Sequence, residues 1–137
     1  MKAPPAGFER LILPGPYPSA AAEIYVKRVR DRRVVGAWGE RRHCNSENSI
    51  HGGFLLTLAD ISLTIGSFEP DDAPPRITLS LTADFLRPAR EGEWLAAHAR
   101  LTKKSANIVF ADAYVYSDKR LVLRASGVFR PVAPPPT

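Results

Sequence analysis

Two glycines and one aspartate, Gly52, Gly53 and Asp60, have the residue types of a site that acts on a carbonyl group. The glycines stand where the sequence pattern predicts the first turn of a helix. Backbone N–H groups there have no partner within the helix and lie at the positive end of its dipole, so they can bind an anion or an oxyanion. An acid close to such donors can activate a nucleophile for acyl transfer.

The predicted helix is apolar over most of its surface. Its apolar residues leave almost no polar arc: Phe54, Leu55, Leu56, Leu58, Ile61, Leu63 and Ile65. The polar residues Thr57, Asp60, Thr64 and Ser67 are spaced so that they form one stripe. A thin solvent-facing stripe explains this pattern without any function. The glycine pair favours a site instead, because glycine is a poor helix former and leaves the backbone donors uncovered.

The length of the helix limits how these two features can work together. Gly52 and Asp60 are eight residues apart, which is roughly 12 Å at about 1.5 Å per residue. An oxyanion at the helix start is therefore out of reach of the carboxylate on the same helix. Either the features are unrelated, or two copies of the helix lie antiparallel across a twofold axis and Gly52 of one copy meets Asp60 of the other.

Length and composition are those of one globular domain. The chain has 137 residues, of which 45% are hydrophobic and 24% charged. Its longest apolar run, near residues 54–66, is broken by polar residues and does not reach the about 20 residues of a membrane span. The first residues lack a secretory pattern, and a single cysteine, Cys44, is typical of a reducing compartment. We therefore expect a cytoplasmic protein that does not bind membranes.

The formal net charge is +5, and seven of the 19 basic residues lie between residues 27 and 42. Such a cluster is compatible with nucleic acid, an acidic membrane or a phosphorylated small molecule. It is equally compatible with the solvated outer face of a sheet. Charge alone does not choose between these classes.

Around the helix, the sequence pattern predicts strands. Residues 23–45 indicate a hairpin with its turn near residues 31–33, and alternation returns in residues 76–88 and 92–104. Turns at 105–107 and 117–119 predict two further hairpin strands, so that three consecutive strands pair antiparallel. The fold class is α+β, with one helix against an antiparallel sheet of five or six strands.

Proline-rich segments flank this pattern. Residues 1–23 and 132–137 are expected to lie outside a single domain at 24–131, because proline resists helix and central strand alike. One sheet covers only part of a helix that is apolar on nearly every side. We therefore expect a second subunit to cover the remainder.

A longer motif carries a resemblance to a known family. Asn45, the run His51-Gly52-Gly53 and Asp60 resemble the pattern of the hotdog-fold thioesterases of the phenylacetic-acid-degradation (PaaI-like) group. The later "RPA" before a turn glycine and the final "ASG-x-FRP" strand are similar to the same family. The match covers about residues 24 to 131.

The resemblance implies a long central helix wrapped by a curved antiparallel sheet, assembled as a homodimer or a dimer of dimers. It implies hydrolysis of acyl-coenzyme A thioesters without a cofactor or metal. At the matching positions, Asn45 and the Gly52 N–H would polarise the thioester carbonyl, with His51 and Gly53 beside the substrate. Asp60 of the neighbouring subunit would activate water or attack directly, and Thr78 stands where relatives carry a residue that assists the water.

Coenzyme A carries several phosphate charges, for which the chain offers cations at its later strand ends. The candidates are Arg87, Arg90, Lys103 and Lys104, and each is equally compatible with a solvated strand end. The rival hypothesis is a hotdog module that binds acyl-coenzyme A without cleaving it, although such a module has no need of Asp60. A nucleic-acid binder that uses the basic cluster is a third hypothesis, which we do not favour.

Other chemistry fits the residues less well. Cys44 beside His43 has the types of a thiol nucleophile and its base, but a lone cysteine is usually a small buried apolar residue. His43, Cys44 and His51 do not make a structural zinc site, which needs four ligands. Asp60 and Ser62 are two residues apart on a helix and point in different directions, so they do not form a hydrolase triad with His51.

Overall fold

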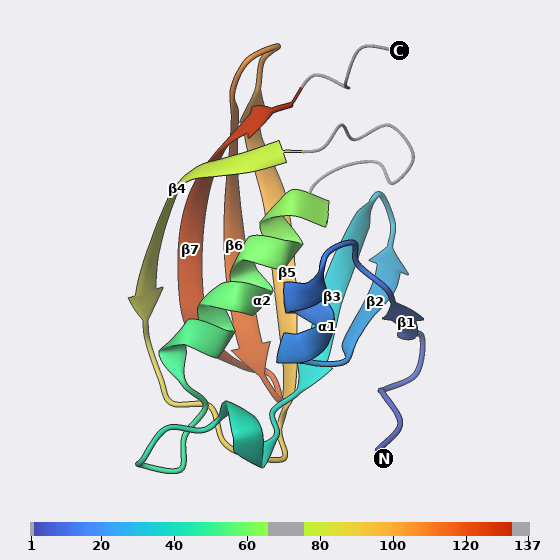
Figure 1. Cartoon of the computed structure of the whole chain (residues 1–137), viewed down its shortest axis with the longest axis vertical. Helices are drawn as coiled ribbons and strands as arrows, with labels where there is room; N and C mark the ends of the chain where they lie inside the picture. Colours follow the sequence, from blue (N-terminus) through green and yellow to red (C-terminus); the bar gives the residue numbers. More distant parts are fainter. Residues whose placement is uncertain (1, 66–75, 133–137) are drawn as a thin grey trace.

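One antiparallel sheet of seven strands curves around a single long helix in the computed structural model, which describes residues 2–65 and 76–132 (Figure 1). The strands are β1 (Glu9–Leu11), β2 (Ile24–Val29), β3 (Arg32–Trp38), β4 (Arg76–Phe85), β5 (Trp94–Lys104), β6 (Val109–Ser117) and β7 (Arg120–Pro131). Their order across the sheet is β1-β2-β3-β5-β6-β7-β4. The long helix is α2 (Gly52–Ile65); a short helix, α1 (Pro16–Ala21), and a 3-10 turn, Arg41–His43, complete the described elements. The predicted α+β class and central helix are confirmed.

The sheet is wider than the five or six strands expected from the sequence. The additional strand, β1, lies within the proline-rich residues 1–23, where Leu11 pairs with Ile24 and Glu9 with Val26 of β2. A proline-free stretch of three residues is enough at an edge, because an edge strand needs hydrogen bonds on one side only. The predicted turn at 31–33 lies one residue earlier, at Arg30, which has a φ of 57°.

The three consecutive hairpin strands are confirmed, and their alternation forms the core. Along β6, Val109, Ala111, Ala113 and Val115 are buried while the residues between them point away from α2. Many of these inward residues are alanines, so the helix approaches closely, and its Leu58 is completely buried. Each large apolar side chain buried in this way contributes about 1.5–3 kcal/mol.

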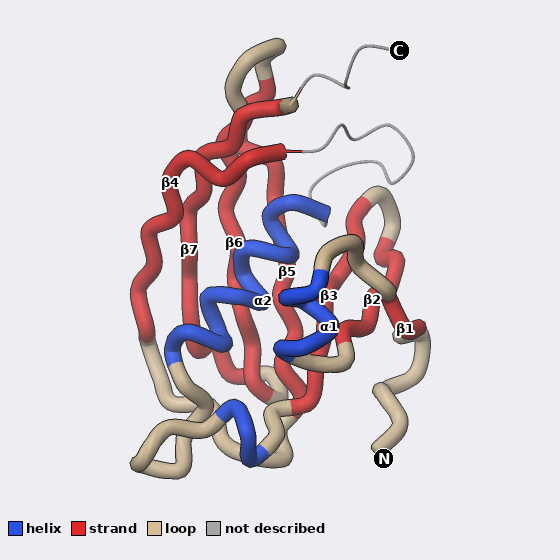
Figure 2. Tube along the Cα trace, in the orientation of Figure 1, coloured by secondary structure: helices blue, strands red, loops and turns tan. Residues whose placement is uncertain are grey.

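Helix and strands form two layers that Figure 2 separates by colour, with α2 lying across the face of the sheet and α1 beside it. α2 contacts β3, β4, β5, β6 and β7. Within the described residues, no helix has the length and hydropathy that a membrane crossing requires. Residues 133–137 of the expected carboxyl-terminal proline-rich segment and the stripe residue Ser67 lie outside the described residues.

Two arginines lie at the carboxyl end of α2, where the last carbonyls have no partner within the helix. Arg33 of β3 donates from Nη2 to the carbonyl of Ile65 at 2.6 Å, and Arg76 of β4 donates from Nη1 to the carbonyl of Thr64 at 3.4 Å. A cation there also meets the negative end of the helix dipole. Burial lowers the pKa of Arg76 to about 10, so it stays charged at neutral pH.

His43 joins the amino-terminal segment to α2. Its ring stacks on Phe54 with 3.8 Å between centroids, and its Nδ1 accepts a hydrogen bond from the Glu40 N–H at 3.0 Å. Nε2 therefore carries the proton and donates to the carbonyl of Ala21, the last residue of α1, at 2.8 Å. Burial, reinforced by the charge of Arg42, lowers the pKa of His43 below its ordinary value, although the Ala21 carbonyl and Glu40 oppose the shift.

We expect the free energy of unfolding to decrease as the pH falls below the ordinary histidine pKa of about 6.5. His43 is held neutral in the folded chain, so the unfolded chain binds more protons in this window and gains stability relative to the folded one. His98, whose pKa is also lowered by burial, acts in the same direction. Urea unfolding at about pH 7.5 and about pH 5.5, at one protein concentration, measures the loss.

His43→Gln isolates the contribution of this one residue. The variant should be less stable by about 1–3 kcal/mol at pH 7.5, because buried hydrogen bonds are lost. It should lose less stability than the wild type between the two pH values. Equal losses in the two proteins would show that His43 does not titrate with unfolding.

Candidate active site

A tight loop before α2 holds the side chain of Asn45 in one orientation. Its Oδ1 accepts hydrogen bonds from the Glu47 N–H at 2.9 Å, the Ser49 N–H at 3.2 Å and the Ser49 hydroxyl at 3.2 Å. Three donors on one side fix which end of the amide is oxygen. The amide nitrogen of Asn45 has no acceptor in the described part of the chain, so it is a donor held ready for another molecule.

The first turn of α2 leaves one backbone donor open. His51 accepts with Nδ1 from the Gly53 N–H at 3.0 Å, and its carbonyl accepts from Phe54 at 2.9 Å and Leu55 at 3.3 Å. The Gly52 N–H has no acceptor among residues 2–65 and 76–132. The helix start therefore presents the N–H of Gly52, while that of Gly53 is already used.

A cavity of about 420 Å³ brings the two open donors together. It is lined by Asn45, Ile50, Gly52, Leu55, Phe85, Leu86, Arg87, Pro88 and Ala89. Phe85 of β4 closes one side, and a Cβ added at Gly52 would lie 2.9 Å from its Cε1. A side chain at this position would have to push the phenyl ring aside.

Asp60 lies elsewhere on α2 and has a partner on the sheet. The hydroxyl of Thr78 on β4 donates to its Oδ1 at 2.9 Å. Neither residue lines the cavity of Asn45 and Gly52. The structure thus arranges the sequence-predicted site residues in two groups. Asn45 and the Gly52 N–H lie at the start of α2, and Asp60 in the middle of α2 pairs with Thr78 of β4.

The rest of the polar stripe has local partners. Thr57 donates to the Gly53 carbonyl at 3.0 Å and shares a hydrogen bond of 2.9 Å with the hydroxyl of Tyr17 in α1. Thr64 donates back to the carbonyls of Asp60 and Ile61. Asp60 is the stripe residue that turns to the sheet.

The predicted phosphate-binding residues do not gather in one protomer. Arg87 lines the donor cavity, and its Nη1 donates to the carbonyl of Leu121 at 2.9 Å. Arg90 lies at the same end of the molecule, in an isolated bridge with Ser49. Lys103 and Lys104 are at the opposite end of β5, far along the strand (Figure 1).

The basic cluster of residues 27–42 is dispersed by the fold. Lys27 and Arg32 lie on the outer face of the sheet, whereas the next residue, Arg33, reaches the end of α2. Arg42 pairs with Glu40 at 2.6 Å near the other end of β3. One continuous basic surface does not result from this arrangement.

His43 and Cys44 do not form a thiol and base pair. Both ring nitrogens of His43 are bonded to backbone groups, and the Cys44 thiol donates weakly to the Glu40 carbonyl at 3.6 Å. Within the described residues, no three histidine, cysteine, aspartate or glutamate side chains are grouped as metal ligands are.

Sequence reasoning missed Phe85 and Tyr17. The sequence presents Phe85 only as one residue of an alternating strand, and nothing in it shows that the ring packs on Gly52. Tyr17 lies in the proline-rich segment, where no periodic pattern indicates a helix that contacts α2.

A model of the Thioesterase superfamily matches residues 47–123, which include Gly52, Asp60 and Thr78. The chain is 36% identical over 127 residues to a Pseudomonas aeruginosa protein named as a putative esterase, across 91% of this chain and 95% of that protein. It is 27% identical over 105 residues to acyl-coenzyme A thioesterase 13 of Mus musculus, across 77% of this chain and 69% of that protein.

The fold is shared with a solved structure of a phenylacetic acid degradation protein. A mutant of PaaI from Thermus thermophilus superposes with a TM-score of 0.74 and 24% sequence identity, across 86% of this chain and 100% of that one. The family match spans α2 and includes its glycine-rich start. The chain therefore belongs to the Thioesterase superfamily and has its hotdog fold.

Proposed function

We propose that this protein hydrolyses acyl-coenzyme A thioesters at a site that two protomers share. The observation that carries the proposal is the separation along α2 between Gly52 and Asp60. Two open donors, the Asn45 amide and the Gly52 N–H, line one cavity, while the acid Asp60 lies two helical turns away. A carbonyl bound by the donors meets an acid only if that acid comes from a second copy.

The residue types suit thioester hydrolysis. Asn45 and Gly52 would donate to the carbonyl oxygen and stabilise the negative charge that develops on it. In the partner, the Thr78 hydroxyl donates to one oxygen of the Asp60 carboxylate of the same chain. The other oxygen is left free to take a proton from water or to attack the carbonyl carbon itself. The thiolate of coenzyme A leaves readily, so one base and one oxyanion site are sufficient.

The edge strand β4 supports a dimer. It is paired with β7 on one side, and its other edge is open in the described chain. Several apolar side chains on and next to it are about half exposed, Ile77 at 45%, Leu79 and Phe85 at 53%, and Leu86 at 43%. A long open edge with apolar side chains is a template for pairing with another strand.

Contacts within one protomer indicate the register of that pairing. Phe85 packs against Gly52, and Thr78 bonds to Asp60. A twofold axis that brings Gly52 to the partner's Asp60 also brings Phe85 near the partner's Thr78. The axis then passes β4 midway between Thr78 and Phe85, at Leu81 or Thr82. It passes α2 midway between Gly52 and Asp60, near Leu56.

Coenzyme A is the proposed carrier because the acyl-coenzyme A thioesterase 13 relative is named for it. Arg87 and Arg90 lie at the donor end, where they can meet phosphate groups. A twofold axis reverses the partner, so Lys103 and Lys104 of the second protomer point toward this end. His51 and Gly53 hold the helix start through their mutual hydrogen bond and thereby position Gly52.

Asp60→Asn should lower kcat by about 100- to 10,000-fold while KM changes little, because the base is lost and both donors remain. The measurement is hydrolysis across a panel of aromatic and aliphatic acyl-coenzyme A substrates. Asp31→Asn in the β2–β3 turn is the matched control and should behave like the wild type. Full activity of Asp60→Asn would remove the acid from the mechanism, and an inactive wild type that still binds the substrates would favour the non-catalytic module.

Mixing two inactive variants tests whether the site is shared. In a heterodimer of Asn45→Ala and Asp60→Asn chains, one site carries both lesions and the other carries none. Random reassembly makes about half the dimers mixed, so activity should return to roughly a quarter of the wild type. The two variants are unfolded and refolded together, and mass spectrometry counts the mixed dimers. Mixed dimers without recovered activity would place each site within one chain.

Charges at the proposed axis should control assembly. On the proposed axis, Thr82 of one protomer lies opposite Thr82 of the partner. Opposite residues of an antiparallel pair have Cα atoms about 4.5–5.5 Å apart, so Thr82→Lys brings two ammonium groups together and weakens the dimer. Thr82→Glu should do the same, and an equal mixture of the two variants should form heterodimers. Light scattering measures all three samples, with Thr102→Lys on β5 as a control. Stable dimers of both single variants would place the interface elsewhere.

A further inference from the structure

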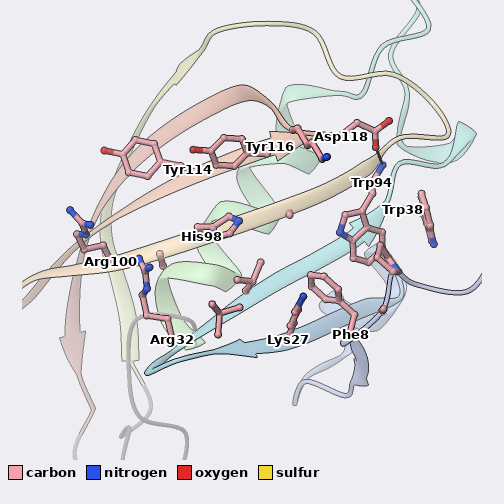
Figure 3. A pocket seen from close by; sticks show the side chains of 17 residues that line it. Phe8, Lys27, Arg32, Trp38, Trp94, His98, Arg100, Tyr114, Tyr116 and Asp118 are labelled. Atoms are coloured by element: carbon pink, nitrogen blue, oxygen red, sulfur yellow. Dashed lines mark hydrogen bonds between the residues drawn. The ribbon is translucent and has the colours of Figure 1, made fainter.

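The face of the sheet opposite α2 holds a cavity with a volume of about 1010 Å³ (Figure 3). Its floor is formed by outward residues of three neighbouring strands, among them Val34 of β3, Ala96 and His98 of β5 and Tyr116 of β6. The amino-terminal segment supplies one wall through Phe8. This volume is at the upper end of that of small-molecule sites, which is about 300–1,000 Å³.

One end of the cavity is aromatic. The Trp94 ring lies 4.9 Å from the ring of Phe8 and 4.9 Å from that of Trp38, both near edge-on. The indole fills the space above Gly36, where an added Cβ would lie only 2.2 Å from Cζ2. Figure 3 shows these rings together, with Tyr114 and Tyr116 on the far side of His98. Such surfaces stack on flat apolar groups.

The other end of the cavity is cationic. Arg32 begins β3, and the register that pairs Val34 with His98 places it across from Arg100. Figure 3 shows both arginines at the end away from Trp94. Like charges on opposite residues repel one another, which an anion between them relieves.

The side chains of Arg32 and Arg100 make no hydrogen bond or ion pair with the described residues. Asp112 pairs with Arg100 in the ladder, but its carboxylate accepts from Thr102 at 3.3 Å and Ser126 at 2.8 Å. The remaining charged groups in the lining are Lys27, Lys119 and Asp118, so cations outnumber the single carboxylate. The charge of the cavity suits an anion.

We propose that this outer cavity binds an aromatic carboxylate, with the carboxylate between Arg32 and Arg100 and the ring over His98 toward Trp94. Arginine pairs with carboxylates in a planar, two-bonded arrangement. The floor offers a bound ring both an aromatic face and an aromatic edge, since His98 and Tyr116 meet edge to face at 5.5 Å. The site is separate from the proposed catalytic site, because the sheet lies between the cavity and α2.

His98 suits the apolar part of this site. Burial, and then the charge of Arg32, lower the pKa of His98, so the ring is neutral at pH 7. A neutral imidazole offers a flat surface without adding a third charge in the middle of the cavity. The same cations argue against a second copy of this face as the occupant, because two cationic rims would meet.

Isothermal titration of the full-length protein with 2-naphthoate tests the site, and 2-naphthamide is the uncharged counterpart. We expect one saturable site per protomer for the carboxylate and binding at least about tenfold weaker for the amide, since a charged hydrogen bond contributes about 1.5–3 kcal/mol. Arg32→Gln and Arg100→Gln should each weaken naphthoate binding by about tenfold, and Arg28→Gln on the neighbouring strand should not.

Ala96→Leu fills the floor of the cavity and should abolish binding. Asp60→Asn should bind naphthoate as the wild type does, which separates this site from any product bound at the catalytic site. Thioester hydrolysis by Ala96→Leu should also be unchanged.

Three results would overturn the proposal. They are an absence of saturable binding, equal affinity for the amide, and undiminished binding by Ala96→Leu. Light scattering adds a further test, because loss of a larger assembly in Ala96→Leu would show that another copy covers this face.

Discussion

Burial of α2 is the constraint on which the rest of the structure depends. The helix is apolar on so many sides that a flat sheet would leave much of it in water, and the seven-stranded sheet curves around it. Alanines at alternate positions of β5 and β6 let the helix approach, and Leu58 and Leu63 become completely buried. Arginines from β3 and β4 then bind the carbonyls at its end, so strands and helix fix one another.

The same helix sets the geometry of the chemistry. Its first turn offers the Gly52 N–H, and its middle carries Asp60, but a rigid helix keeps the two apart. β4 contacts both parts of the helix, because Phe85 packs against the first turn and Thr78 bonds to the Asp60 carboxylate. A strand that contacts both groups of site residues, and whose second edge is open in the described chain, would connect the proposed dimer to the proposed catalysis.

The two faces of the sheet have different physical characters. The inner face is filled by aliphatic side chains, and the outer face carries large rings and arginines over the same strands. Two neighbouring residues of β5 show the difference. Leu95 is buried in the core, while the ring of Trp94 packs with Phe8 and Trp38 on the outer face. The period of two in each strand separates a packed core from a hollow, cationic surface.

The sequence by itself determined the class of the fold and supplied the candidate residues of the proposed site. Periodicity predicted the central helix, which the structure describes at Gly52–Ile65, and the three hairpin strands at the end of the chain, because burial requires apolar residues at fixed spacing. The spacing of Gly52 and Asp60 already indicated that one helix cannot hold both halves of a site. The motif around His51 indicated the family to which the chain belongs.

Only the tertiary structure decided which distant residues meet. β1 was hidden in a proline-rich segment, since a three-residue edge strand has too short a pattern to detect. The contacts of Thr78 with Asp60 and Phe85 with Gly52 depend on where β4 lies beside α2, and no local propensity encodes that placement. The outer cavity likewise arises from strands far apart in the sequence, because side chains become neighbours through strand register and not through sequence spacing.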